Sequence, residues 1–172
     1  MRNTTSLAVL AASALIGLGA ATISPAAGAT ATTEKQRGIV LECTGSAHGL
    51  SAYASLYEND KHGNVVQVIL DDDPDLAKSR SPKDDFLVDG KLRTGVSIDG
   101  RRATISGTAV RVGPKKHVHE EVDDAGEHIV SDGFHRRLAD DLVLRYGTRI
   151  VPLECSPAFY YNLTVTREQI EG

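Results

Sequence analysis

Residues 37–43, Arg-Gly-Ile-Val-Leu-Glu-Cys, form a short apolar run that ends at Cys43 and precedes Thr44-Gly45. A run of this length, bounded by turn residues, is typical of a buried strand. The chain has one other cysteine, Cys155, and outside the cell pairing of the two is the default. Because a disulfide requires Cα atoms within about 7 Å, the first strand must lie beside the segment that precedes the last strand. Sheets whose ends meet in this way are barrels or sandwiches.

The N-terminus has the pattern of a secretory signal. Arg2 precedes an uncharged apolar run from Leu7 to Ile23, and Ala27-Gly28-Ala29 supplies the small residues that a signal peptidase requires. A retained membrane anchor is the alternative, but the small residues at the exit favour cleavage. We therefore predict a secreted, extracellular protein with a signal peptide at 1–29, a flexible leader at 30–36 and a single β-rich domain at 37–172.

The charge of the mature chain limits its partners. Loss of Arg2 leaves 18 of the 19 basic residues against 23 acidic ones, a formal charge of 18 − 23 = −5. This acidic balance argues against a nucleic acid and, after signal cleavage, against a membrane as the main partner. The absence of Trp counts against a carbohydrate site built on stacked indoles.

Strand patterns recur along the mature chain. Asp89-Gly90 and Asp99-Gly100 each predict a tight hairpin turn, and a bulge at Gly107 would reconcile two phases of alternation in the strand around it. Further strands are predicted at 51–58, 65–70, 102–112, 148–155 and 159–167. The predicted fold is therefore mainly β, a small antiparallel barrel or sandwich closed by the Cys43–Cys155 disulfide.

Two segments depart from this pattern. Residues 71–85 are polar, charged and broken by two prolines, which predicts a long exposed loop. Phe134, Leu138, Leu142 and Tyr146 are spaced four apart, which fits one short helix around 134–146. Asp140-Asp141 could equally form a turn between two strands, and we favour strands.

A histidine-rich hairpin is the first candidate site. Strands at 115–122 and 127–131 would place one set of polar residues on a single face and Val118, Val122 and Ile129 on the opposite, buried face. The polar set is His117, His119, Glu121, His128 and Asp132. Histidines two apart on a strand can bind zinc or copper, so His117, His119 and His128 define a metal-binding alternative. We predict instead a solvated face that binds these metals weakly, with Kd above about 10 μM.

Three weaker candidates remain. The aspartates of 71–75 could bind Ca²⁺ but lack the glycine and glutamate of an EF-hand, so a solvated turn is favoured. Ser46 and His48 suggest a hydrolase, although no orienting carboxylate is evident. The basic stretch at 78–83 resembles the exposed loop of a protease inhibitor, yet nothing braces it, so a flexible connection is favoured.

The sequence therefore predicts a non-enzymatic binding or inhibitor module that engages a protein or small ligand through loops or a barrel mouth. It predicts no catalytic residues, no cofactor and no metal. The first alternative is an exported metal-binding protein that uses the histidine hairpin, and the second is a hydrolase.

Overall fold

The computed structural model describes residues 31–170, so the predicted signal peptide at 1–29 lies outside the described residues. Among them, no helix is long and apolar enough to cross a membrane. The strands are β1 (Thr32–Ala47), β2 (Leu50–Asn59), β3 (Val65–Leu70), β4 (Ala77–Arg80), β5 (Leu87–Val88), β6 (Lys91–Ile98), β7 (Arg101–Arg111), β8 (Lys116–Asp124), β9 (Glu127–Tyr146) and β10 (Arg149–Gln169), with a 3-10 helix, η1 (Pro74–Leu76), between β3 and β4.

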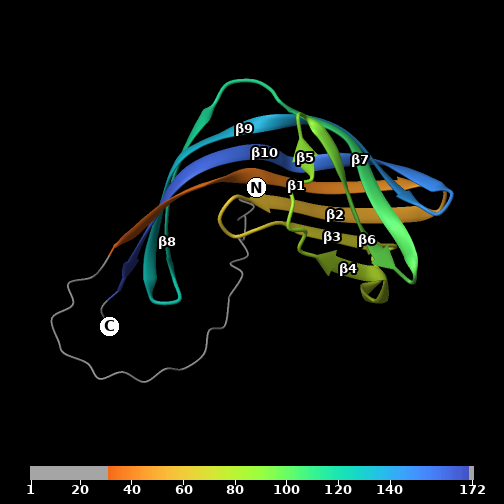
Figure 1. Cartoon of the computed structure of the whole chain (residues 1–172), viewed down its shortest axis with the longest axis horizontal. Helices are drawn as coiled ribbons and strands as arrows, with labels where there is room; N and C mark the ends of the chain where they lie inside the picture. Colours follow the sequence, from red (N-terminus) through yellow and green to blue (C-terminus); the bar gives the residue numbers. More distant parts are fainter. Residues whose placement is uncertain (1–30, 171–172) are drawn as a thin grey trace, which may run out of the picture.

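The strands form one antiparallel sheet of ten strands, in the order β4-β3-β2-β1-β10-β9-β7-β6-β5, and β8 pairs with β9. The sheet curls into a half-barrel, from which β1, β9 and β10 extend to one side (Figure 1). The first and last strands are therefore neighbours at the middle of the sheet. The predicted disulfide joins them there, with Cα atoms of Cys43 and Cys155 3.9 Å apart.

The barrel is only half-closed, whereas the sequence predicts a closed barrel or a sandwich. The strands at the two edges, β4 and β5, are only four and two residues long. They offer too few backbone groups to complete the ladder. Side chains bridge this seam instead: Arg80 donates through Nε to the Gly95 carbonyl at 2.5 Å and through Nη2 to the Thr94 hydroxyl at 3.1 Å.

The core of the half-barrel follows from alternation of buried side chains along its strands. In β2, residues 50, 52, 54 and 56 are buried and their neighbours are half-buried, as expected for a strand with one face toward a core. Residues of β1, β3, β6, β7, β9 and β10 complete this core. The largest fully buried side chains are Leu41, Leu50, Leu56, Leu70, Leu92, Ile98, Ile105, Leu138, Leu142, Leu144, Val66 and Val68.

Both predicted Asp-Gly turns are confirmed, because Asp89-Gly90 and Asp99-Gly100 have positive φ at both residues. The bulge predicted at Gly107 is wrong. The register of β7 runs without a shift against β6 and β9. Ala109 continues the buried phase, and Val110 points outward with 47% of its surface exposed.

Residues 134–146 form neither a helix nor two strands, because β9 runs unbroken through Asp140-Asp141. The helical interpretation failed for a simple reason: a spacing of four is also a multiple of the strand period of two. Leu138, Leu142 and Leu144 are accordingly buried on one face of β9.

Two further segments are more ordered than the sequence predicts. β1 begins at Thr32, inside the segment assigned to a flexible leader, and pairs with β10 from that residue on. The segment 71–85 is not a continuous loop, because it contains η1 and β4, and β4 pairs with β3. Both segments have low hydrophobicity, so their sequences do not predict strands. They contain strands because they pair with neighbouring strands.

We call the extension beyond the half-barrel the arm. It consists of β8 with residues 127–135 of β9, 161–169 of β10 and 32–38 of β1, paired side by side in that order. No residue of β8 is buried. The arm therefore projects from the half-barrel as a sheet without a core of its own (Figure 1).

Candidate functional site

One face of the arm carries the predicted polar set, which we call the histidine face: His117, His119, Glu121, His128 and Asp132. The hairpin register places His119 opposite Asp132 and Asp123 opposite His128, so these side chains share a face. His119 Nδ1 lies 3.1 Å from Asp132 Oδ2, and its Nε2 lies 3.1 Å from Glu121 Oε1. The predicted grouping of the histidines with carboxylates is therefore correct.

The carboxylates change how two of the histidines titrate. The hydrogen bond to Asp132, and then that to Glu121, raises the pKa of His119. The hydrogen bond to Asp123, at 2.6 Å, raises the pKa of His128. Each carboxylate favours the protonated ring beside it. The rings of His119 and His128 therefore stay protonated to a higher pH than the ring of a free histidine does.

The same hydrogen bonds bear on the metal-binding alternative. His119 directs both ring nitrogens at carboxylates, and His117 Nε2 lies 3.5 Å from Asp132 Oδ2. Within residues 31–170, no three His, Cys, Asp or Glu side chains are grouped as metal ligands would be. Weak metal binding by His117, His119 and His128 stays a prediction.

The opposite side of the arm, which we call the apolar face, carries Val118, Val122, Ile129, Leu163 and Val165. Cross-strand pairing joins Val122 to Ile129, and it joins Gly133 to both Val118 and Leu163. The predicted burial of this face is wrong at β8: Val122 is 55% exposed, and Val118 and Ile129 are half-buried. Val165 on β10 is buried. The aliphatic surface thus becomes more exposed toward β8.

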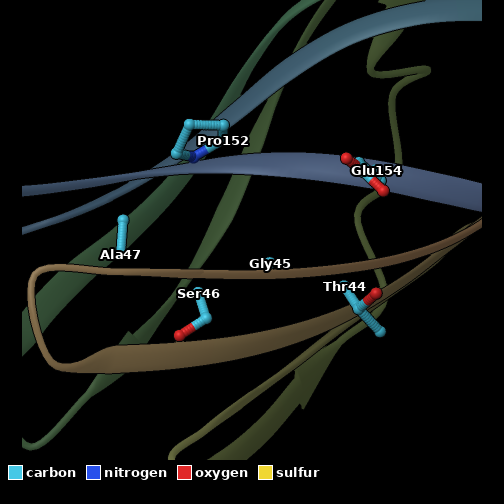
Figure 2. A pocket seen from close by; sticks show the side chains of 6 residues that line it. All are labelled: Thr44, Gly45, Ser46, Ala47, Pro152 and Glu154. Carbon is cyan, nitrogen blue, oxygen red and sulfur yellow. The ribbon is translucent and has the colours of Figure 1, made fainter.

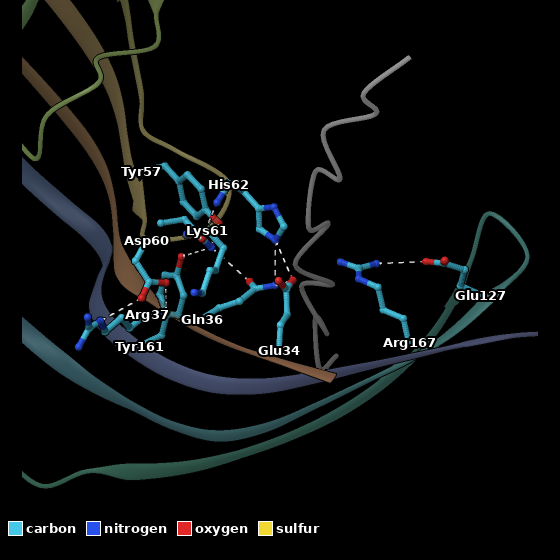
Figure 3. Close-up of polar contacts among 11 residues, drawn as sticks. Glu34, Gln36, Arg37, Tyr57, Asp60, Lys61, His62, Glu127, Tyr161 and Arg167 are labelled. Atoms are coloured by element: carbon cyan, nitrogen blue, oxygen red, sulfur yellow. Dashed lines mark hydrogen bonds and ion pairs between the residues drawn. The ribbon is translucent and has the colours of Figure 1, made fainter. Parts of the chain in front are cut away.

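Polar groups border the apolar face on the concave side of the curved strands (Figure 3). Glu34, Gln36 and Arg167 project from β1 and β10 into this concavity. Arg167 pairs with Glu127 at 3.3 Å, and Glu34 lies 3.0 Å from His62 Nε2. Charges of both signs therefore surround an aliphatic centre.

A polar cluster marks the junction between the arm and the half-barrel. The Tyr161 hydroxyl donates to the Glu58 carbonyl and accepts a bond from Asn59 Nδ2 at 2.8 Å, and burial raises the pKa of Tyr161. The ring crosses β1 at Gly38, where a Cβ would lie 1.7 Å from the Glu58 carbonyl oxygen and 2.7 Å from the Tyr161 hydroxyl. Sequence reasoning missed this cluster, although Gly38 inside an apolar strand was a signal of close backbone approach.

The hydrolase candidate falls near a shallow hollow at the other end of β1. Ser46 lines this hollow with Thr44, Gly45, Ala47, Pro152 and Glu154 (Figure 2). His48 instead occupies the β1–β2 turn, at φ 54°. Among the described residues, neither Ser46 nor His48 donates or accepts a side-chain hydrogen bond, so the structure does not assemble a nucleophile with its base.

The remaining two candidates have local structural roles. Asp71 Oδ1 accepts the Ser51 amide at 2.9 Å, and Asp73 caps η1 by accepting the Asp75 amide at 2.9 Å. The basic stretch at 78–83 is a flexible connection neither as a whole nor in its first half, because Lys78, Ser79 and Arg80 belong to β4. Arg80 serves the barrel seam.

The arm is therefore the region of the described structure where sequence-predicted residues converge. Its histidine face is charged, its apolar face is aliphatic, and its outer strand is exposed. Comparison with known proteins adds no further information: no family model, no curated protein and no solved structure matches the chain.

Proposed function

We propose that this chain is an exported, non-enzymatic binding module that holds a protein partner on the apolar face of its arm. The observation that carries the proposal is the exposure of that face. Val122 is 55% exposed at its outer end, and Val118, Ile129 and Leu163 are only half-buried. An antiparallel sheet ordinarily covers its aliphatic face with a core. Here Val165 is buried, but the described residues leave the aliphatic side chains nearer to β8 partly or largely exposed.

Energetics favour a covered apolar face. Removing aliphatic surface from water contributes about 25 cal/mol per Å², so covering these side chains would stabilise a complex. A contiguous exposed aliphatic surface on a soluble protein commonly marks an interaction site. The border of Glu34, His62, Glu127 and Arg167 matches the polar rim that surrounds the apolar centre of a protein interface.

The curvature of the arm suits a protein ligand better than a small molecule. A small-molecule site encloses most of its ligand, whereas the arm is an open, concave sheet (Figure 3). An extended or helical segment of a partner would fit along it. Export is supported by the signal pattern of residues 1–29 and by the Cys43–Cys155 disulfide, which suits an oxidising compartment.

Site-specific photocrosslinking tests the proposal. A photoreactive amino acid at Ile129 lies on the apolar face, and the same group at Ile150, 37% exposed on the half-barrel, is the matched control. Both variants are expressed in the native host and the exported protein is recovered from the medium. We expect an adduct with one distinct protein from position 129 and none from position 150.

Two results would refute the proposal. One is an equal yield of adducts from the two positions, which would indicate random contact. The other is an adduct at position 129 that contains only a second copy of this chain, because the proposed partner is a different protein.

A further inference from the structure

The outer edge of the arm is a free strand. Among the described strands β8 has one neighbour, β9, and every residue of β8 except Val118 is exposed. The β8–β9 turn consists of Ala125 and Gly126, both with positive φ, at 50° and 82°, as in a two-residue hairpin. In such a hairpin Asp124 and Glu127 form a hydrogen-bonded pair, so the backbone groups of the odd-numbered residues of β8 point outward.

The charges of β8 are segregated along its length. Lys116, His117 and His119 occupy its first half, and Glu121, Asp123 and Asp124 occupy its second half. A strand of this kind is complementary to itself when it runs antiparallel to a copy, because each basic end then meets an acidic end.

We infer that two copies of this chain associate edge to edge, with β8 of one copy antiparallel to β8 of the other and a two-fold axis at Glu120. The register follows from centring the nine residues of Lys116–Asp124. Lys116 then lies opposite Asp124 of the second copy, His117 opposite Asp123, Val118 opposite Val122, and His119 opposite Glu121.

The backbone supports the same register. Opposite residues in it are His117 with Asp123 and His119 with Glu121, and these are the residues whose N–H and C=O groups point outward. Such pairs exchange two hydrogen bonds each in an antiparallel ladder. The even-numbered pairs, Lys116 with Asp124 and Val118 with Val122, fall at the closer non-bonded positions, where side chains interact most.

The surfaces on both sides remain continuous across the axis. Opposite residues in an antiparallel pair share a face, so the histidine face of one copy joins that of the other. The contact of Val118 with Val122 covers part of the exposed end of the apolar face. A two-fold axis uses the same patch on both copies and closes the assembly at a dimer.

Glu120 is the one unfavourable position. It faces its own copy at the axis, and two like charges directly opposite are destabilising. No side-chain hydrogen bond joins Glu120 to another described residue, so Glu120→Gln leaves the internal contacts of the arm unchanged. The variant is expected to dimerise more tightly than the natural chain, by roughly threefold to tenfold.

Charge reversal provides the decisive experiment. Lys116→Glu alone and Asp124→Lys alone each place two like-charged pairs in the dimer, so each variant should dissociate with a Kd raised by roughly tenfold. An equimolar mixture of the two variants contains only opposite-charged pairs in the mixed dimer and should recover the natural affinity. Sedimentation equilibrium of the mature chain over a concentration series measures all four samples.

Disulfide trapping gives an independent readout that a folding defect cannot imitate. Glu120→Cys should crosslink readily to its own copy at the axis, whereas Glu121→Cys, one residue away and opposite His119, should crosslink far less. A natural chain that stays monomeric up to about 1 mM overturns the inference. So does a dimer whose affinity is the same in both charge variants, or equal crosslinking at positions 120 and 121.

Discussion

The half-barrel and the arm are built from the same three long strands, yet they differ in what their alternation achieves. In the half-barrel, β9 buries Leu138, Leu142 and Leu144 in a core shared with six other strands. In the arm, the same strand leaves Ile129 half-buried and directs His128 and Asp132 to an exposed face. Alternation of side chains therefore predicts a strand in both regions. Only in the half-barrel does the sheet curl far enough for the side chains on its inner face to pack into a core. The half-barrel thus contains most of the buried side chains, whereas the outer strand of the arm is exposed.

Removal of the disulfide is expected to have the largest effect on stability. The disulfide lies in the half-barrel and joins two strands, β1 and β10, that also form the arm. Cys43→Ser with Cys155→Ser removes a link across 112 residues. We expect the free energy of unfolding to fall by about 4 kcal/mol, since a long loop gains chain entropy in the unfolded state. Urea unfolding of the double variant and the natural chain measures the difference. An unchanged midpoint would show that the pairing of β1 with β10 alone holds the two ends of the domain together.

A pair of truncations compares the two regions directly. Leu142→Ala removes a side chain that is 1% exposed in the half-barrel core and is expected to cost about 3 kcal/mol, from lost burial and a cavity. Ile129→Ala removes a half-buried side chain of the arm and is expected to cost less than about 1 kcal/mol. Equal losses in thermal or urea unfolding would contradict the view that the arm lies outside the stabilising core.

The smallest effect concerns pH. Glu58 is 8% exposed at the junction end of the half-barrel, and its Oε1 accepts the Phe86 and Leu87 amides at 2.5 and 2.8 Å. Burial raises the pKa of Glu58 above its ordinary value of 4.5 despite those bonds. The folded state therefore binds this proton more tightly than the unfolded state, and stability falls as pH rises from 4.5 through the folded pKa.

Glu58→Gln retains the acceptor oxygen and removes this titration. We expect the variant to gain stability relative to the natural chain as pH rises through that range, by less than about 1 kcal/mol. His119→Gln on the arm is the matched control. The pKa of His119 is raised above its ordinary value of 6.5, so any effect of this variant on the pH dependence of stability falls at higher pH than that of Glu58→Gln. Melting temperatures of both variants and the natural chain, measured from pH 4 to 8, distinguish the effects of Glu58 and His119. A constant difference between the natural chain and Glu58→Gln would disprove the assignment.

The sequence predicted the features that depend on nearby residues or on general chemistry. The Asp-Gly turns, the disulfide and the shared face of His119 and Asp132 all follow from turn conformation, redox chemistry and strand period. Gly38 indicated a close backbone approach, but its partner Tyr161 could not be predicted, because the fold alone brings together residues more than a hundred positions apart. The exposure of Val122 was missed for the opposite reason: alternation marks which face is aliphatic but not whether anything covers it.

The central pairing of β1 with β10 also constrains the order in which the molecule can fold. Thr32 pairs with Arg167 and Cys43 with Cys155, so the middle of the sheet needs almost the whole chain. A chain that emerges N-terminus first has to hold β1 with one unpaired edge until β10 follows. Contacts between residues so distant in sequence make folding slow. The pairing of β1 with β10, and the Cys43–Cys155 disulfide within it, can therefore form only after β10 has been synthesised.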